Sequence, residues 1–209
     1  MTTDPEALLD FWFEDCDRDA ERLAEAVRRW FAPNPELDRA IRERYGDLPQ
    51  RAAEGALDAW QQAPRPALAR VIVLDQFPRN LHRGSADAFA WDGLAKRASE
   101  QAIAAGFDAA LTPIEATFLY LPFEHAEDLA SQDRCVALYE ALAARARPDL
   151  AAKFDEFTGY ARRHREVIAR FGRFPHRNAA LGREPTDAER AYLAEGGEDF
   201  SGSHVEQAS

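Results

Sequence analysis

The stretch PALARVIVLDQFP, residues 66–78, decides the fold class. Its centre, Val71–Leu74, is the one segment that could form a buried β-strand, because four apolar residues follow one another there. These four residues lie within a longer pattern of Ala, Arg and Leu that starts at Pro66 and stops at Pro78. The length of that pattern favours a buried helix over a strand. We therefore predict an all-α fold.

The signals outside this stretch are typical of helix starts. Asp4-Pro5 and Asn34-Pro35 each combine an N-cap residue with a proline at the first helical position. Capping boxes begin at Thr112 and Thr186, each with Glu three residues later. We expect some ten helices of about 8–20 residues, joined by short connections that favour antiparallel pairs. The expected later helices lie near 48–61, 66–76, 87–105, 113–129, 131–146, 149–171 and 186–195.

The composition indicates an ordinary soluble globular protein. The chain has 209 residues, of which 46% are hydrophobic and 30% charged. This length suits one helical domain, residues 1–196, followed by an expected mobile tail, residues 197–209. The N-terminal residues lack the pattern of a signal peptide, and no apolar run approaches the ~18 residues of a membrane span. We therefore expect a cytoplasmic protein without a membrane partner. Cys16 and Cys135 lack metal-site spacing, and reduced core thiols are favoured over a disulfide.

Positive charge is concentrated in one segment of an acidic chain. The net charge of −11 argues against binding to nucleic acid. Residues 162–183, however, contain seven arginines and a single acidic residue, Glu166, for a local charge of +6. Such a segment suits either a local anion site or internal pairing with acidic residues elsewhere.

Two segments far apart in the sequence resemble each other. Residues 171–178 read Phe-Gly-Arg-Phe-Pro-His-Arg-Asn, and residues 75–80 read Asp-Gln-Phe-Pro-Arg-Asn, followed by His82 and Arg83. Each joins an apolar helix to a Phe-Pro pair and then to Arg, His or Asn. Arginine offers a planar fork of donors for carboxylate or phosphate, and a helix starting within 176–182 would add free backbone N–H groups. We expect Asp75 and Arg79 to meet Arg173, His176 and Arg177 in space, near His125 or His164.

The histidines have both functional and structural interpretations. His164 lies on one helix face with Tyr160, Ile168 and Phe171, at spacings of four and three residues. It is either a core histidine with satisfied ring nitrogens or a base that faces a site. His125 lies with Tyr120 and Glu127 around Pro122, which we expect to break its helix. No His-x-x-x-His or His-Glu-x-x-His pattern occurs, so we predict no metal site and no cofactor.

With these residues in hand, the chain resembles a family of mostly bacterial proteins catalogued as domain of unknown function 924. The resemblance covers about residues 7 to 195, and it implies an all-helical, tetratricopeptide-like α–α superhelix without an established activity. Ala116 and Ala126 depart from the family pattern, which usually has Arg and Ser at these positions. The first departure weakens any role for position 116 in a site. The resemblance is carried by residues 11–13, 30–31, 74–80, 118–125, 170–178 and 181–183.

Three interpretations of these motifs stay open. The first is a pocket for an anionic small molecule bearing phosphate or carboxylate, with histidine acid/base chemistry. The second is a tetratricopeptide-like interaction module that holds an acidic peptide, with the Arg and His motifs mainly structural. The third is a buried polar core. For the pocket, the candidate catalytic residues are Asp75, His125, His164 and His176, and the candidate ligand-binding residues are Arg79, Asn80, Arg83, Tyr120, Arg173, Arg177 and Asn178.

Overall fold

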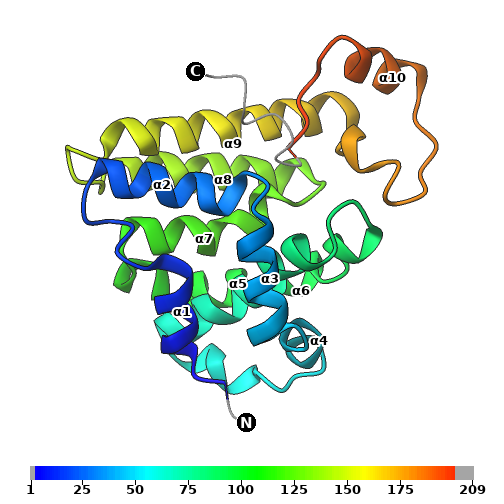
Figure 1. Cartoon of the computed structure of the whole chain (residues 1–209). Helices are drawn as coiled ribbons and strands as arrows, with labels where there is room; N and C mark the ends of the chain where they lie inside the picture. The colour runs from blue at the N-terminus through cyan, green and yellow to red at the C-terminus, as the bar shows by residue number, and fades with distance from the viewer. Residues whose placement is uncertain (1–2, 201–209) are drawn as a thin grey trace.

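A computed structural model describes residues 3–200 of the chain, and this part contains ten α-helices, four short 3₁₀ helices and no strand (Figure 1). The all-α prediction is therefore confirmed, and residues 201–209 of the expected tail lie outside the described residues. The α-helices are α1 (Pro5–Phe13), α2 (Ala20–Phe31), α3 (Pro35–Tyr45), α4 (Leu48–Ala53), α5 (Pro64–Leu81), α6 (Asp92–Ala104), α7 (Pro113–Glu124), α8 (Leu129–Ala143), α9 (Ala151–Phe171) and α10 (Asp187–Ala194). The 3₁₀ helices are η1 (Asp58–Gln62), η2 (Ala86–Phe89), η3 (Phe107–Ala110) and η4 (Pro175–Arg177).

Helix α5 is the central element of the fold. It packs against α1, α3, α4, α6 and α7, so most of its surface is covered by other helices. Val71–Leu74 is fully helical and buried, as the sequence indicated. The expected end at Pro78 is wrong, because α5 continues to Leu81. Proline removes one backbone donor but keeps a helical φ, and the backbone N–H of His82 still closes the last turn on the Pro78 carbonyl at 2.9 Å.

Helix α7 is the most completely buried helix of the described chain. The predicted capping box is present, with Thr112 and Glu115 each accepting a backbone N–H of the other residue. Every residue of α7 except Pro113 is buried. The helix passes Pro122 and ends at Glu124, so the expected extent to residue 129 was wrong. Because α7 is surrounded, its polar residues near the C-terminal end, Glu124 and His125, are held inside the molecule.

Three other boundaries differ from the prediction. The expected helix 87–105 starts later, because residues 86–89 form η2 and α6 begins at Asp92. The expected helix 48–61 is split, because Gly55 adopts a left-handed conformation between α4 and η1. No α-helix begins within residues 176–182, where only the 3₁₀ turn η4 and further turns form. The backbone anion site that such a helix would have provided is therefore not formed.

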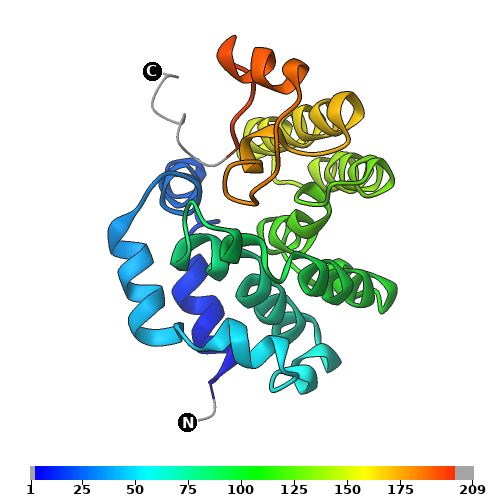
Figure 2. The ribbon, with the colours of Figure 1, turned by 90° about the vertical axis from the view of Figure 1, so that its right-hand side faces the viewer.

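Helices α7, α8 and α9 form successive antiparallel tiers, which Figure 1 shows one above the other and Figure 2 shows turned by 90°. The chain turns at Gly172, whose left-handed conformation (φ 69°) ends α9. Beyond this turn, η4 runs back toward the C-terminal end of α7. Helix α10 lies near the C-terminal end of α9. This return places the second Phe-Pro segment beside the polar end of α7.

The N-terminal helices are fastened by an aromatic cluster around Phe118 of α7. The centre of the Phe118 ring lies 4.7 Å from that of Trp30, 5.3 Å from that of Phe13 and 5.6 Å from that of Trp12. In each pair the rings are nearly edge to face. The Trp30 indole donates to the carbonyl oxygen of Trp12 at 2.9 Å. Trp12 and Trp30 are thus core residues, and the thiols of Cys16 and Cys135 are free and buried.

We predict that Phe118→Ala lowers the free energy of unfolding by roughly 3–5 kcal/mol, as for other large buried aromatics. Urea denaturation followed by circular dichroism measures this loss. The matched control is Leu129→Ala in α8, where the side chain is 42% exposed, and its effect should stay within about 0.5 kcal/mol. A loss below about 1 kcal/mol for Phe118→Ala would contradict the close packing of the aromatic cluster.

Candidate functional site

The centre of the candidate site is a contact between Asp75 of α5 and His125, the residue that follows α7. The Nδ1 atom of His125 lies 2.8 Å from Oδ1 of Asp75, and Gln76 donates to Oδ2 of the same carboxylate at 2.6 Å. The Asp75 side chain is 1% exposed and that of His125 14% exposed. A carboxylate with such partners accepts hydrogen bonds only, so the Nδ1 proton of His125 points at Asp75. The Nε2 atom is then the free, proton-accepting nitrogen of the ring.

The protonation states of this pair follow from its surroundings. Burial alone would raise the pKa of Asp75, but the positive charge and hydrogen bonds of its neighbours, with His125 and Arg79 foremost, lower it. Burial and the charge of Arg79 lower the pKa of His125, against the opposing pull of Asp75. Near neutral pH the pair is therefore an aspartate beside a neutral imidazole.

A second carboxylate, Asp92 at the start of α6, joins the two Phe-Pro segments. Arg79 binds it with both terminal nitrogens, at 2.8 and 3.0 Å, and also donates to the backbone oxygen of Asp75 at 2.7 Å. Arg177 of η4 lies 3.5 Å from the same carboxylate and donates to the carbonyl oxygen of His125 at 3.0 Å. The predicted meeting of Asp75 and Arg79 with Arg177 near His125 is thus confirmed, and Asp92 mediates it.

Arg177 is the least neutralised cation of this network. Its guanidinium carbon lies 4.5 Å from the Phe174 ring centre and 4.7 Å from that of Phe89, so two aromatic rings flank it. Its Nε atom is buried without a hydrogen-bond partner among the described residues. Burial and the nearby Arg79 lower the pKa of Arg177 to about 10, against the opposing charges of Asp92, Glu127 and Asp75.

Five of the candidate residues belong to other clusters. Arg173 pairs with Glu189 of α10 at 2.6 and 2.7 Å, and Asn178 donates to the same carboxylate at 3.3 Å. The expectation that Arg173 joins Arg79 and Arg177 was therefore wrong, because Glu189 holds it on the α10 side. The remaining three make contacts elsewhere: Asn80 and Arg83 bind Asp38 of α3, and Tyr120 donates to Asp108 of η3.

His164 and His176 lie beside this centre without joining it by hydrogen bonds among the described residues. The Nδ1 atom of His164 is 3.0 Å from the Tyr160 carbonyl, which matches the core-histidine interpretation, and 3.7 Å from the buried carboxyl of Glu124. Burial, with Arg177 adding to it, lowers the pKa of His176 to about 4. Burial and the charge of Asp75 raise the pKa of Glu124 to about 8. Glu124 therefore favours the protonated form at neutral pH.

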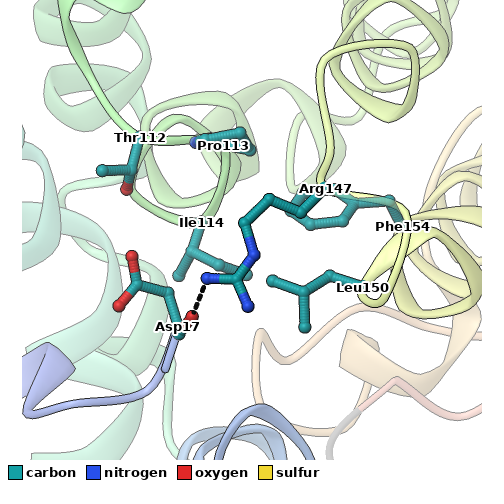
Figure 3. A pocket seen from close by; sticks show the side chains of 7 residues that line it. All are labelled: Asp17, Thr112, Pro113, Ile114, Arg147, Leu150 and Phe154. Carbon is teal, nitrogen blue, oxygen red and sulfur yellow. Dashed lines mark hydrogen bonds between the residues drawn. The ribbon is translucent and has the colours of Figure 1, made fainter. Parts of the chain in front are cut away.

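Two hollows of the described chain lie away from this network. One, of about 40 Å³, is lined by seven residues that include Asp17, Ile114, Arg147 and Phe154, and Arg147 donates across it to the Asp17 carbonyl at 2.8 Å (Figure 3). An adjoining hollow of about 190 Å³ is lined by Cys16, Arg65 and Glu115, among others. Neither contains a residue of the Asp75–Asp92 network. Within residues 3–200, no three His, Cys, Asp or Glu side chains are grouped as metal ligands, and no helix has the length and apolarity to cross a membrane.

These observations define an all-α protein with a buried Arg–Asp–His network between its Phe-Pro segments. The chain belongs to the family described as bacterial protein of unknown function (DUF924), whose model matches residues 8–197. A solved structure of a protein of unknown function from Agrobacterium tumefaciens, ATU0120, is similar to it. The two share 36% sequence identity over 91% of this chain and 97% of that chain, with a TM-score of 0.77. No curated protein matches the chain. The comparisons thus support the family and the fold, and they give no activity.

Asp92, Glu189 and Glu124 were missed as members of the polar clusters. Asp92 follows a tryptophan at a helix start, where an acidic residue is ordinary, and Glu189 was recognised only as part of a capping box. Glu124 had a detectable signal, because it directly follows the long run of apolar and aromatic residues 118–123 in the same helix. A carboxyl group there is expected to be buried and to need a partner.

The raised pKa of Glu124 predicts a specific pH dependence. Between its ordinary value of 4.5 and about 8, the folded chain keeps a proton that the unfolded chain has released. The contribution of Glu124 to the free energy of unfolding is therefore fully present below about pH 4.5, and it decreases as the pH rises toward 8. Glu124→Gln, which is neutral at every pH, should gain stability over the wild type from pH 5 to pH 8, by on the order of 1–3 kcal/mol.

Urea unfolding of both proteins at a series of pH values measures this difference. Glu140→Gln, in the half-exposed pair with Arg162, is the control and should give a difference that is nearly constant with pH. A constant difference for Glu124→Gln as well would show that its carboxyl is ionised in the folded state.

The Asp75–His125 contact leads to a second prediction, which concerns the pKa and the tautomer of His125. The Asp75 charge and hydrogen bond raise the pKa of His125 against burial, so Asp75→Asn should lower that pKa further. It should also mix the two ring tautomers, because the amide no longer demands a proton on Nδ1. Heteronuclear NMR of the imidazole nitrogens measures both effects. Asp108→Asn, which removes the acceptor of Tyr120 instead, should leave the His125 signals in place; an unchanged His125 in Asp75→Asn would refute the contact.

Proposed function

We propose that the chain binds an anionic small molecule, bearing phosphate or carboxylate, at Arg177 and His125. The observation that carries the proposal is the combination of an oriented imidazole with an under-neutralised guanidinium, joined through the His125 carbonyl. A bound anion would supply the negative charge that Asp92 cannot give to two arginines at once. The free Nε2 of His125 would then accept or donate a proton at the ligand, which is the acid/base role expected from the sequence.

The geometry of Arg177 supports anion recognition in particular. Its guanidinium is fixed between Phe89 and Phe174, so little side-chain entropy would be lost on binding. Asp75 plays the part of an orienting carboxylate, since it holds the His125 ring in one tautomer. Arg79 has a positioning role only, because its terminal nitrogens are bound by Asp92 and by the Asp75 carbonyl.

The alternative is an interaction module in a tetratricopeptide-like α–α superhelix, with the Arg and His motifs mainly structural. The antiparallel tiers α7, α8 and α9 support the superhelix, and the ion pairs support the structural role. Arg173 and Arg183 each bind one carboxylate, Glu189 and Glu127, with two nitrogens. In the central network, Asp75 and Asp92 match Arg79 and Arg177 in number, so no external anion is needed for charge balance.

A thermal-shift screen with phosphorylated and carboxylated metabolites, with and without divalent metals, separates these two functions. A ligand at 100 times its Kd stabilises by about 2.7 kcal/mol, or roughly 5–11 °C in Tm for a chain of this size. Arg177→Ala should abolish this shift, and Arg177→Lys should reduce it, since lysine keeps the charge but loses the planar fork. Arg173→Ala is the control and should keep the full ligand shift.

The stability of Arg177→Ala without ligand distinguishes a binding role of this arginine from a structural one. Under the proposal the loss is at most about 1–2 kcal/mol, because Arg79 still neutralises Asp92. A loss of roughly 3–5 kcal/mol, the cost of breaking a buried ion pair, together with no concentration-dependent shift by any compound, would establish the structural role instead.

A further inference from the structure

The C-terminal segment of the described chain returns from α10 to α9 and covers part of its surface (Figure 1). The return is built by two glycines. Gly196 adopts a left-handed conformation (φ 81°), and a Cβ atom on Gly197 would lie 2.5 Å from the Tyr192 ring. The backbone N–H of Glu198 donates to the Tyr192 hydroxyl at 2.8 Å. The direction of the segment is therefore determined by α10 itself.

Phe200 fits into a cradle of aromatic and imidazole rings from α9 and η4. Its ring stacks on His164 at 3.5 Å between centres, with an angle of 20° between the planes. Three further rings surround it at steep angles, with centres 5.5 Å (Tyr160), 5.9 Å (Phe174) and 5.7 Å (His176) away. The cradle thus contacts one inserted ring from four directions, which is the geometry of an aromatic anchor in a binding site.

Charge complements this ring contact. Glu198 pairs with Arg163 of α9 at 3.0 Å, and Arg163 also lies 4.7 Å above the Tyr160 ring. Both side chains are well exposed, so this pair contributes little affinity and mainly favours an acidic residue at that position. The His176 Nδ1 atom at the cradle is buried without a hydrogen-bond partner among the described residues, which leaves one polar position unused.

We propose that this cradle, formed by Tyr160, Arg163, His164, Phe174 and His176, docks an acidic segment with an aromatic residue from a partner protein. The chain's own Glu198-Asp199-Phe200 is the intramolecular competitor for the same cradle. A segment of this chemistry, the chain's own, is already seated in the cradle and contacts residues of the cationic stretch 162–183. The inference rests on the interaction-module alternative, to which it gives a surface and a partner. It shares only the Phe174 ring with the anion site proposed at Arg177 and His125.

The energetics of such competition are simple. Because the segment is tethered to α10, its effective concentration at the cradle is on the order of 1 mM or higher. A peptide with an intrinsic Kd of about 0.1 mM would therefore bind the wild-type chain roughly ten times more weakly than a chain whose own segment is disabled. Removing Phe200 should uncover the cradle while the rest of the chain stays in place.

The experiment uses fluorescence anisotropy of a labelled peptide with the sequence of residues 195–200, Glu-Gly-Gly-Glu-Asp-Phe. The full chain with Phe200→Ala should bind it saturably, and about ten-fold or more tightly than the wild type. A peptide with Ala in place of Phe should lose binding. Arg163→Ala, added to Phe200→Ala, should weaken it several-fold, whereas added Arg162→Ala, which removes a half-exposed pair with Glu140, should leave it unchanged. Every variant keeps Arg177 and His125, so this result does not depend on the anion site.

A chain truncated after Gly197, checked for helicity by circular dichroism, should behave as Phe200→Ala does, and a chain truncated after Phe200 should behave as the wild type does. Absence of saturable binding to Phe200→Ala, or equal binding of the two peptides, would overturn the proposal. A wild-type chain that is dimeric by light scattering and becomes monomeric on truncation after Gly197 would also overturn it, because the occupant would then be a second copy of the chain.

Discussion

The arrangement of the polar interior depends on the carboxylate of Asp92. It binds Arg79 of α5 with two hydrogen bonds and lies 3.5 Å from Arg177 of η4, so it connects helices α5 and α6 with the segment that follows α9. A buried arginine without a counter-charge is costly, and both arginines therefore require the start of α6 to lie where it does. Such pairs add little net stability compared with apolar packing, but they discriminate against other arrangements of the same helices. We therefore regard Asp92 as a determinant of how the two halves of the chain fit together.

The position of Asp92 also explains which polar groups of the network have hydrogen-bond partners and which do not. Arg79 uses its donors on Asp92 and on the backbone of α5, while Asp75 is bound by Gln76 and His125. What is left without a close carboxylate partner is one imidazole nitrogen of His125 and the buried Arg177, which is flanked by rings. Oriented histidines and desolvated cations are typical of functional sites, but ion-pair networks produce the same perturbations. Arg177 fits both cases, since it lies 3.5 Å from the Asp92 carboxylate while its Nε atom has no hydrogen-bond partner among the described residues.

Much of this architecture could be predicted from the sequence, and the failures have identifiable causes. The capping boxes at Thr112 and Thr186 predicted helix starts correctly because a cap is a local interaction of four residues. The likeness of the two Phe-Pro segments predicted that Asp75, Arg79 and Arg177 meet. Pro78 and Pro122 misled the prediction of helix ends, because burial of α5 and α7 compensates for the lost backbone hydrogen bond. Arg173 was misplaced because its partner, Glu189, lies in a short helix whose position no local pattern reveals.

The partner of an arginine is a property of the tertiary fold, and for this reason site prediction from the sequence was weaker than fold prediction. Residues 162–183 contain seven arginines, and the sequence alone could not divide them between internal pairing and recognition. In the structure these arginines differ in their partners and in their exposure. Arg173 and Arg183 are bound by single carboxylates, Arg177 is enclosed by rings, and Arg163 is exposed beside the chain's own acidic segment. Charge density along the sequence therefore located the arginines, and the fold determines how each of them is paired.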